Sequence, residues 1–214
     1  VTGTSRKDFN PFESQDYIHI PIELSNLDEL NVKLKPVFAS GDAPQVLINN
    51  AAIFAEADIS SDDEFWMHTY QHHLDVNLIT PSLTSKWGIQ SWLESKTEGI
   101  LINITSRAGS RGDTQEYAAY AATKGGLVAF TKSLARSYGK SGITAYTISP
   151  GFVQTDMAIE SMEVYGEEYL TKDLALHQIA PPEEIAELCH LLASGKLKHA
   201  TGQNFHINSG SYLI

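Results

Sequence analysis

Short, continuously apolar segments recur along this chain, and a longer stretch with helical periodicity follows each of them. Residues 45–50, 100–106 and 143–149 have the composition of parallel strands that are buried on both faces. Parallel strands that are joined by helices of more than ten residues need right-handed crossovers. The alternation therefore predicts an α/β fold, a doubly wound and mostly parallel Rossmann-like sheet with helices on both faces.

Further elements complete this pattern. We expect strands at residues 1–6, 17–24 and 204–208, and helices at about 25–38, 62–95, 117–138 and 182–193, with Pro81 as the joint between two helices in the second of these. No repeat, linker or low-complexity run interrupts the alternation. Residues 1–214 are therefore expected to form a single domain.

Composition excludes several classes of protein. A chain of 214 residues with 42% hydrophobic and 19% charged residues is ordinary for a globular domain with a large core. A net charge of −11, with scattered basic residues, argues against a nucleic-acid partner. No apolar run reaches the roughly 18 residues that span a bilayer. The one cysteine, Cys189, lies in an apolar helical pattern and is expected in the core, so we expect a cytoplasmic protein.

Polar side chains gather where the predicted strands end. Because the carboxyl ends of parallel strands meet at one edge of a sheet, and ligands bind beyond that edge, these residues predict a binding site there. They are Arg6, Glu23, Asn49, Asn50, Ser106 and Thr155.

Tyr120 and Lys124 lie four residues apart on a predicted helix, so their side chains share one face. A neighbouring ammonium stabilises a phenolate, and we expect it to lower the pKa of Tyr120 toward the working range of an acid or base. An exposed pair of this kind is more often a solvated helix face. The Ser106 hydroxyl, at the end of the preceding strand, favours a proton-transfer site.

Six motifs occur in one order along the chain, and together they carry a resemblance to a known family. They are Asn49–Ala52, Asp75–Leu78, Ile102–Ser106, Tyr120–Gly126, Pro150–Met157 and Thr201–Gly202. The chain resembles the classical short-chain dehydrogenases/reductases, and among them the branch similar to 3-oxoacyl carrier-protein reductase. The resemblance covers nearly the whole chain.

The resemblance implies an oxidoreductase that transfers hydride between a nicotinamide cofactor and a carbonyl or secondary-alcohol substrate. It makes Tyr120 the general acid/base and Ser106 the hydrogen-bond donor to the substrate oxygen. It makes Lys124 the group whose positive charge keeps the phenol of Tyr120 acidic. It also places a relay water near Asn77. The implied cofactor-binding residues are Arg6, Glu23, Leu24, Asn50, Tyr120, Lys124, Val153 and Thr155.

The choice between the two nicotinamide cofactors depends on Arg6, which follows the strand that resembles the family's second strand. An arginine there can bind the 2′-phosphate of NADP, and no acidic residue occupies the position that favours NAD. NADP is therefore expected over NAD. The family usually has Asp at Glu23 and Gly at Ala52, which are modest departures.

One departure is larger. The family binds the cofactor pyrophosphate on a Gly-rich turn between its first strand and helix, and Thr2-Gly3-Thr4 does not match that turn. By this alignment the first βα unit, roughly 30 residues with a central strand, is missing, and we expect a longer parent protein that contains it. The alternative to an enzyme is a catalytically incompetent relative that serves as a binding or assembly module. Cofactor affinity distinguishes the two.

Other clusters have simpler interpretations. His68, His72 and His73 lack the partners of a zinc site and are expected on a solvated helix face, so no metal site is predicted. Trp66, Trp87 and Trp92 are expected in the core or an interface. The resemblance implies a homotetramer or a homodimer.

Residues 158–177 occupy the position of the family's substrate lid. Its apolar side chains would line the site and its glutamates would face outward, which favours an uncharged carbonyl substrate. The apolar set is Met157, Met162, Tyr165, Tyr169 and Leu170, and the acidic set is Glu160, Glu163, Glu167 and Glu168.

Overall fold

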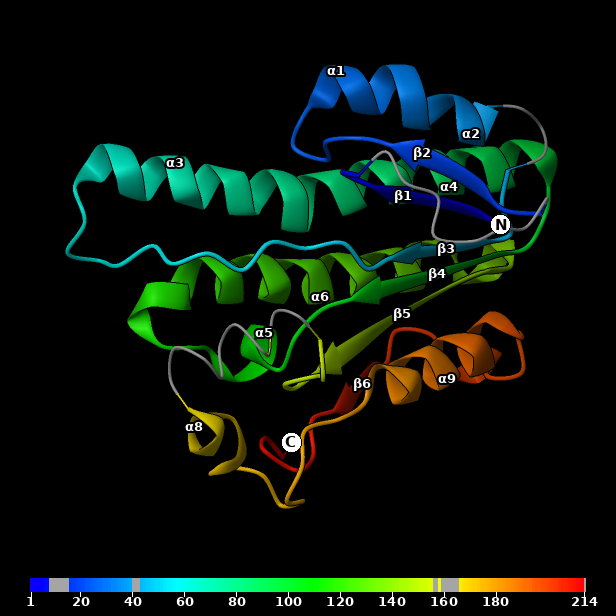
Figure 1. The fold of residues 1–214 in the computed structure, drawn as a ribbon. Coiled ribbons are helices and arrows are strands. Elements are labelled where there is room, and N and C mark those ends of the chain that lie inside the picture. Colours follow the sequence, from blue (N-terminus) through cyan, green and yellow to red (C-terminus); the bar gives the residue numbers. More distant parts are fainter. Residues whose placement is uncertain (8–15, 40–42, 156–157, 159–165, 214) are drawn as a thin grey trace.

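The computed structural model describes residues 1–7, 16–39, 43–155, 158 and 166–213, and its elements follow the predicted alternation (Figure 1). The strands are β1 (Thr2–Ser5), β2 (Ile18–Pro21), β3 (Val46–Asn49), β4 (Gly99–Ile104), β5 (Ile143–Pro150) and β6 (Asn204–Ile207). The longer helices are α3 (Asp63–Leu74), α4 (Thr80–Ser95), α6 (Ala118–Tyr138) and α9 (Pro182–Ala193). The shorter ones include α5 (Ala108–Arg111) and α8 (Glu167–Thr171).

The strands are all parallel, but they form two sheets instead of the single predicted one. Four strands pair in the order β3-β4-β5-β6, and β1 pairs only with β2. Within the described ranges, no strand pairs with the free edge of β1 or with the edge of β3 that faces away from β4. This division agrees with the expectation that the family's central strand has no counterpart in these residues.

Helices cover both faces of the four-stranded sheet (Figure 1). On one face, Leu101 and Ala145 pack against α6, and α4 contributes Trp92 to the same layer. On the other face, Ile102 and Tyr146 pack against Leu192 of α9. Neighbouring residues of a strand point to opposite faces, so the continuous apolar runs serve both layers. The doubly wound arrangement is confirmed.

The β1-β2 pair is joined to the rest of the molecule by the helical segment that follows it. This segment consists of α1 (Leu27–Glu29), a π-helical turn (Leu30–Leu34) and α2 (Lys35–Ala39). The side chain of Asn26 accepts the first free backbone N–H groups of α1, as its position as a cap predicts. Phe38 packs on Trp87 of α4, with 6.1 Å between the ring centroids. The N-terminal pair therefore sits over α4.

The long helical stretch before β4 contains the predicted joint. Asp62 caps α3 by accepting the backbone N–H of Phe65 at 2.9 Å. A π-helical turn, Asp75–Ile79, connects α3 to α4, and Pro81 lies in the first turn of α4. Turns of this kind shift the backbone hydrogen bonds and are frequent at functional sites. Asn77 lies in the middle of this turn.

A chain of buried amides holds the sheet to the helices behind it. Asn49 donates to Asn103 at 2.8 Å, and Asn103 donates to Thr131 of α6 at 2.8 Å. Thr84 of α4 donates to the Asn49 side-chain oxygen at 2.8 Å. Asn49 was expected in the ligand site, but its amide is used to join β3 to β4 and α4.

Candidate active site

Ser106 and Tyr120 come together from two elements. Ser106 lies just beyond β4, and Tyr120 lies in the first turn of α6. The Ser106 hydroxyl lies close enough to the phenol of Tyr120 to lower its pKa. It also accepts the backbone N–H of Ala108 at 3.1 Å, which fixes it at the start of α5. The predicted juxtaposition of hydroxyl and phenol is therefore present.

Two glycines allow the segment after Ser106 to approach α6. A Cβ on Gly109 would lie 2.7 Å from the backbone carbon of Lys124, and a Cβ on Gly125 would lie 3.0 Å from the carbonyl oxygen of Gly109. The first distance is one that real Cβ atoms essentially never show, and the second is tighter than most real Cβ contacts. α5 therefore packs on the backbone of α6 beside the reactive residues.

Lys124 is buried in the protein, with 2% of its surface exposed. Its Nζ donates to the backbone oxygen of Ile104 at 3.0 Å and lies 5.7 Å from the centroid of the Tyr120 ring. Burial penalises the charged form, and it lowers the pKa of Lys124 from 10.5 to about 8.

The pKa of Tyr120 moves in the opposite direction to our expectation. Burial raises it from 10.0 to about 12, although the hydrogen bond from Ser106 lowers it in part. The expected lowering by the Lys124 ammonium was wrong for this state of the protein, because that ammonium points to Ile104 and is itself stripped of water. Desolvation outweighs the charge of the neighbour.

An aromatic wall packs against Tyr120. Phe54 stacks on Tyr117 with 4.0 Å between centroids and meets Tyr120 edge-on at 4.9 Å. His73 lies beneath this wall and is fully buried. It accepts the N–H of Ala55 at 3.2 Å and donates to the Thr69 oxygen at 2.9 Å, and burial lowers its pKa. A neutral His73 thus braces the segment that carries Phe54.

Asn77 braces the same segment from the π-helical turn. Its side chain, 1% exposed, accepts the N–H of Ile53 at 2.8 Å and donates to the Ile53 oxygen at 3.0 Å. It also donates to Thr123 of α6 at 3.4 Å. The Asn77 amide is therefore committed to positioning, and the relay water near it stays a prediction.

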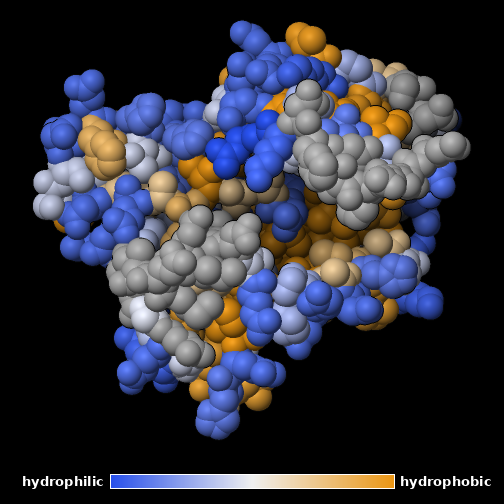
Figure 2. Space-filling view, viewed as in Figure 1, coloured by the Kyte–Doolittle hydropathy of each residue, from blue (hydrophilic) through white to orange (hydrophobic). Residues whose placement is uncertain are grey.

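The reactive residues line a cavity of about 1300 Å³. Figure 2 shows this face of the molecule as a recess with a hydrophobic floor above α9. The cavity is larger than a pocket for a single small molecule, which holds roughly 300–1000 Å³. Its walls include five predicted site residues besides Ser106, namely Asn50, Tyr120, Lys124, Val153 and Thr155.

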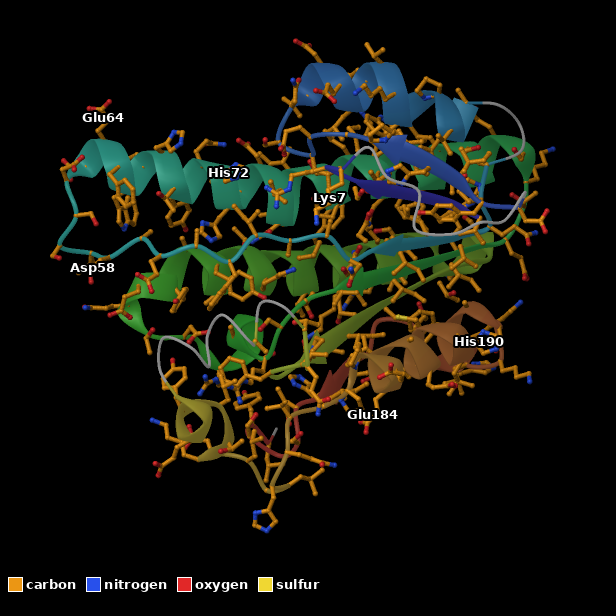
Figure 3. The ribbon with its side chains drawn as sticks, viewed as in Figure 1. Lys7, Asp58, Glu64, His72, Glu184 and His190 are labelled. Atoms are coloured by element: carbon orange, nitrogen blue, oxygen red, sulfur yellow. The ribbon has the colours of Figure 1, made fainter. Side chains whose placement is uncertain are left out.

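Three predicted cofactor residues do not line this cavity. Arg6 is exposed and follows β1, next to Lys7, which Figure 3 labels. The Glu23 carboxylate accepts the N–H and hydroxyl of Ser25, at 3.3 and 3.1 Å. Leu24 packs against the core beneath α2. Their contact with a cofactor stays a prediction.

The predicted lid is described only in part. Tyr169 of α8 lines the cavity, and Leu170 is buried against Ala158 and Ile179. Glu168 is exposed, as predicted. The side chain of Glu167 lies outside the described part of the chain. So do five other residues of the predicted lid, namely Met157, Glu160, Met162, Glu163 and Tyr165.

Several residues of the site were not singled out from the sequence. No motif contains Phe54, and His73 was considered only in the histidine cluster expected on a solvated helix face, so packing alone shows that both belong to the site. Arg107 follows Ser106 directly, and its buried guanidinium lines the cavity beside Phe152. A basic residue next to a reactive serine was the one signal that could have indicated it.

The remaining clusters behave as follows in the described part of the chain. His68 is exposed as predicted, but His73 is buried, which corrects the expected solvated face. Among the described residues, no group of three or more potential ligands could hold a metal, and no helix combines the length and the apolar character that a membrane span needs.

Trp87 and Trp92 are in the core, as expected. Cys189 is partly exposed to the cavity, and burial raises the pKa of its thiol.

Comparison with known proteins decides the family. A sequence model of the family described as Enoyl-(Acyl carrier protein) reductase matches residues 9–211. A solved structure of a short chain dehydrogenase/reductase family protein superimposes with a TM-score of 0.78 at 25% identity, over 92% of this chain and 78% of that one. The chain belongs to the short-chain dehydrogenase/reductase family. The resemblance that the six motifs carried is confirmed.

Named relatives of this family member are oxidoreductases. The 3-oxoacyl-[acyl-carrier-protein] reductase FabG of Vibrio cholerae is 29% identical over 223 residues, which cover 100% of this chain and 87% of that protein. FabG of Staphylococcus aureus (strain Mu50) is 30% identical over 92% of this chain and 78% of its own. A 4-hydroxyisoleucine dehydrogenase mutant, solved with NADH and succinate, superimposes with a TM-score of 0.86 at 26% identity, covering 98% and 87% of the two chains. This short-chain dehydrogenase/reductase is an oxidoreductase.

Proposed function

We propose that this protein interconverts a carbonyl compound and a secondary alcohol by hydride transfer, with Tyr120 as the general acid/base. The observation that carries the proposal is that Ser106, Tyr120 and Lys124 line the same large cavity, with the Ser106 hydroxyl close enough to the phenol to lower its pKa. Two hydroxyls that meet there can both reach one substrate oxygen. Lys124 lies one helical turn from Tyr120, within the same wall.

A nicotinamide cofactor fits the residues that the cavity brings together. Asn50, Val153 and Thr155, the predicted contacts, line the same cavity as Tyr120. The cavity volume of about 1300 Å³ leaves room for a substrate beside the nicotinamide. The related 4-hydroxyisoleucine dehydrogenase was solved with NADH, which supports a cofactor of this class. NADP is favoured over NAD because Arg6 follows β1 at the predicted position for a 2′-phosphate contact.

The chain's own residues then handle the oxygen and its proton. A bound reduced nicotinamide supplies the hydride to the carbonyl carbon. Ser106 donates a hydrogen bond to the oxygen as negative charge develops on it. The phenolic O–H bond of Tyr120 breaks and its proton passes to that oxygen, leaving a phenolate. A phenol with a pKa of about 12 can still protonate an alkoxide, which is a stronger base than a phenolate.

Lys124 and the π-helical turn would restore the proton. Lys124, with a pKa of about 8, can give up a proton near neutral pH and regain it. The side chain of Asn77 is committed to Ile53, so a relay water would bind a backbone oxygen of the turn. In the direction of oxidation, the same steps run in reverse.

Transfer of a label tests this function. The protein is incubated with a ketone and with NADPH or NADH that carries deuterium at the transferring C4 position. We expect the product alcohol to carry one deuterium on its carbinol carbon, with NADPH as the better donor. An alcohol without deuterium would contradict direct hydride transfer from the nicotinamide, and no reaction together with no affinity for either cofactor would favour the assembly-module alternative.

We also propose the assembly and the compartment that the sequence suggested. A homotetramer or homodimer rests on the family resemblance, and sedimentation at micromolar concentration tests it, since a monomer would contradict it. A reducing, cytoplasmic environment is supported by the single cysteine, Cys189.

A further inference from the structure

Arg107, the residue after Ser106, carries a buried charge that the protein itself does not fully pair. Only 7% of its surface is exposed, and its Nη1 is buried without a hydrogen-bond partner. A guanidinium is so strong a base that it stays protonated inside proteins. Burying such a cation without a partner costs several kcal/mol. Arg107 lines the cavity, so a bound molecule can reach it.

The groups around Arg107 hold it in place without neutralising it. Its Cζ lies 4.6 Å from the centroid of the Phe152 ring, a cation–π contact that orients the planar guanidinium. Burial and the charge of Arg111 lower the pKa of Arg107, and Asp113 and Asp173 raise it. Among the described residues no carboxylate forms an ion pair with Arg107, and Asp113 lies 3.9 Å from Arg111 instead.

The end of the cavity beside Ser106 is therefore positive in a chain that is strongly negative. Arg107, Arg111 and Lys172 line it, against the carboxylates of Asp113 and Asp173. The whole chain has a net charge of −11. A local excess of cations in a protein of this charge attracts anions to this one place.

We propose that the substrate carries a carboxylate, and that Arg107 binds this carboxylate while Ser106 and Tyr120 hold the reacting oxygen. This inference deepens the proposed function and rests on it. Arg107, Ser106 and Tyr120 line the same cavity, so the carboxylate and the reacting oxygen can belong to one bound molecule. The substrate class is then an oxo acid or the corresponding hydroxy acid. A carboxylate can take two parallel hydrogen bonds from a guanidinium, which satisfies Nη1.

This assignment differs from the uncharged substrate that residues 158–177 suggested. That expectation considered only the apolar and acidic side chains of the predicted lid. The buried cation belongs to the segment between β4 and α5, and its burial could not be read from sequence.

Binding measurements test the carboxylate site without depending on turnover. The probes are 3-oxobutanoate and its methyl ester, which differ in charge, titrated calorimetrically into the protein. We expect the wild type to bind the acid about thirty-fold more tightly than the ester, as a charge-assisted hydrogen bond allows. Arg107→Met should reduce this ratio to about one and leave the ester affinity unchanged. Arg136→Met, on the exposed end of α6, is the matched control and should retain the ratio.

Two results would overturn the proposal. One is equal affinity of the wild type for acid and ester, a result that needs no variant. The other is an equal loss of both affinities in a folded Arg107→Met, since that would make Arg107 a structural residue. Should Arg107→Met fail to fold, Arg107→Lys retains the charge and loses the planar fork, and we expect the acid-to-ester ratio to fall without reaching one.

Turnover of the same pair separates this proposal from the proposed function. Reduction of both compounds at equal kcat/KM by the wild type would contradict the carboxylate site and leave hydride transfer standing. Binding of the acid that depends on Arg107, with no reduction by either cofactor, would support the site and contradict the proposed function.

Discussion

At the scale of single residues, burial decides the chemistry of the central pair. The spacing of Tyr120 and Lys124 correctly predicted that they share a face of α6. It could not predict that both lie in surroundings that penalise charge, where the pKa of the phenol rises to about 12 and that of the ammonium falls to about 8. Spacing along a helix is local, whereas desolvation depends on everything that packs around the helix.

The buried Lys124 predicts a pH dependence of stability. Below about pH 8 Lys124 is charged in both the folded and the unfolded state, so its buried charge destabilises the folded protein by the full amount. Between about pH 8 and 10.5 the unfolded chain keeps this proton while the folded protein releases it, so the free energy of unfolding rises with pH. The lowering of the Lys124 pKa from 10.5 to about 8 corresponds to a rise of about 3 kcal/mol in the free energy of unfolding across this range. Lys124→Met should lack this rise, as urea unfolding across this range would measure.

A second lysine of α6 provides the control. Lys132 is exposed, and Lys132→Met should show the same pH dependence as the wild type. Tyr120 contributes only above its ordinary pKa of 10.0, where stability falls with pH in all three proteins. A difference between wild type and Lys124→Met that stays constant across the range would contradict the buried charge.

At the scale of elements, the contact between α5 and α6 holds the site together. α5 carries the segment after Ser106, and α6 carries Tyr120 and Lys124. Their backbones approach at Gly109 and Gly125, where a Cβ does not fit. This contact sets the distance between the hydroxyl of Ser106 and the phenol of Tyr120.

Gly109→Ala is expected to separate the two helices. Its Cβ would meet backbone atoms of α6 at 2.7 and 2.8 Å, and backbone cannot rotate away as a side chain can. We expect a loss of about 1–3 kcal/mol in the free energy of unfolding. A lower kcat should accompany it, because Ser106 and Tyr120 no longer reach one oxygen.

Gly139→Ala, beyond the end of α6, is the control for this substitution. A Cβ there meets nothing within 4 Å, and the backbone φ of −55° suits any residue. Unchanged or slightly higher stability is expected for it. If Gly109→Ala had the same stability and the same kcat as Gly139→Ala, the claim that the α5–α6 contact at Gly109 positions Ser106 and Tyr120 would be contradicted.

The elements themselves were largely predictable from sequence. The buried strands β3, β4 and β5 are continuous apolar runs, and α9 begins with the predicted proline. The π-helical turns at Leu30–Leu34 and Asp75–Ile79 were not predictable, because their hydrogen bonds depart from the α-helical pattern without a change in side-chain periodicity. The use of Asn49 and Asn77 as braces likewise depends on neighbours that are distant in sequence.

At the scale of the whole molecule, the arrangement of strands places one cavity where several distant segments meet. Segments after β3, β4 and β5, together with α9, all contribute to it. The parallel order and the family could be predicted, because six motifs occur in sequence along the chain. The division into two sheets agrees with the missing central strand that the alignment indicated, whereas the positive end of the cavity depends on how these segments pack and became visible only in three dimensions.

The most direct test of the account compares Tyr120→Phe with the wild type. The substitution removes one oxygen and keeps the ring that packs on Phe54. Ketone reduction is followed by the oxidation of NADPH or NADH, and cofactor affinity by the fluorescence of the bound cofactor. The account predicts that turnover falls by about 10²–10⁴-fold or more while the cofactor Kd stays nearly unchanged. Retention of most activity by Tyr120→Phe would contradict the role of Tyr120 as the acid/base.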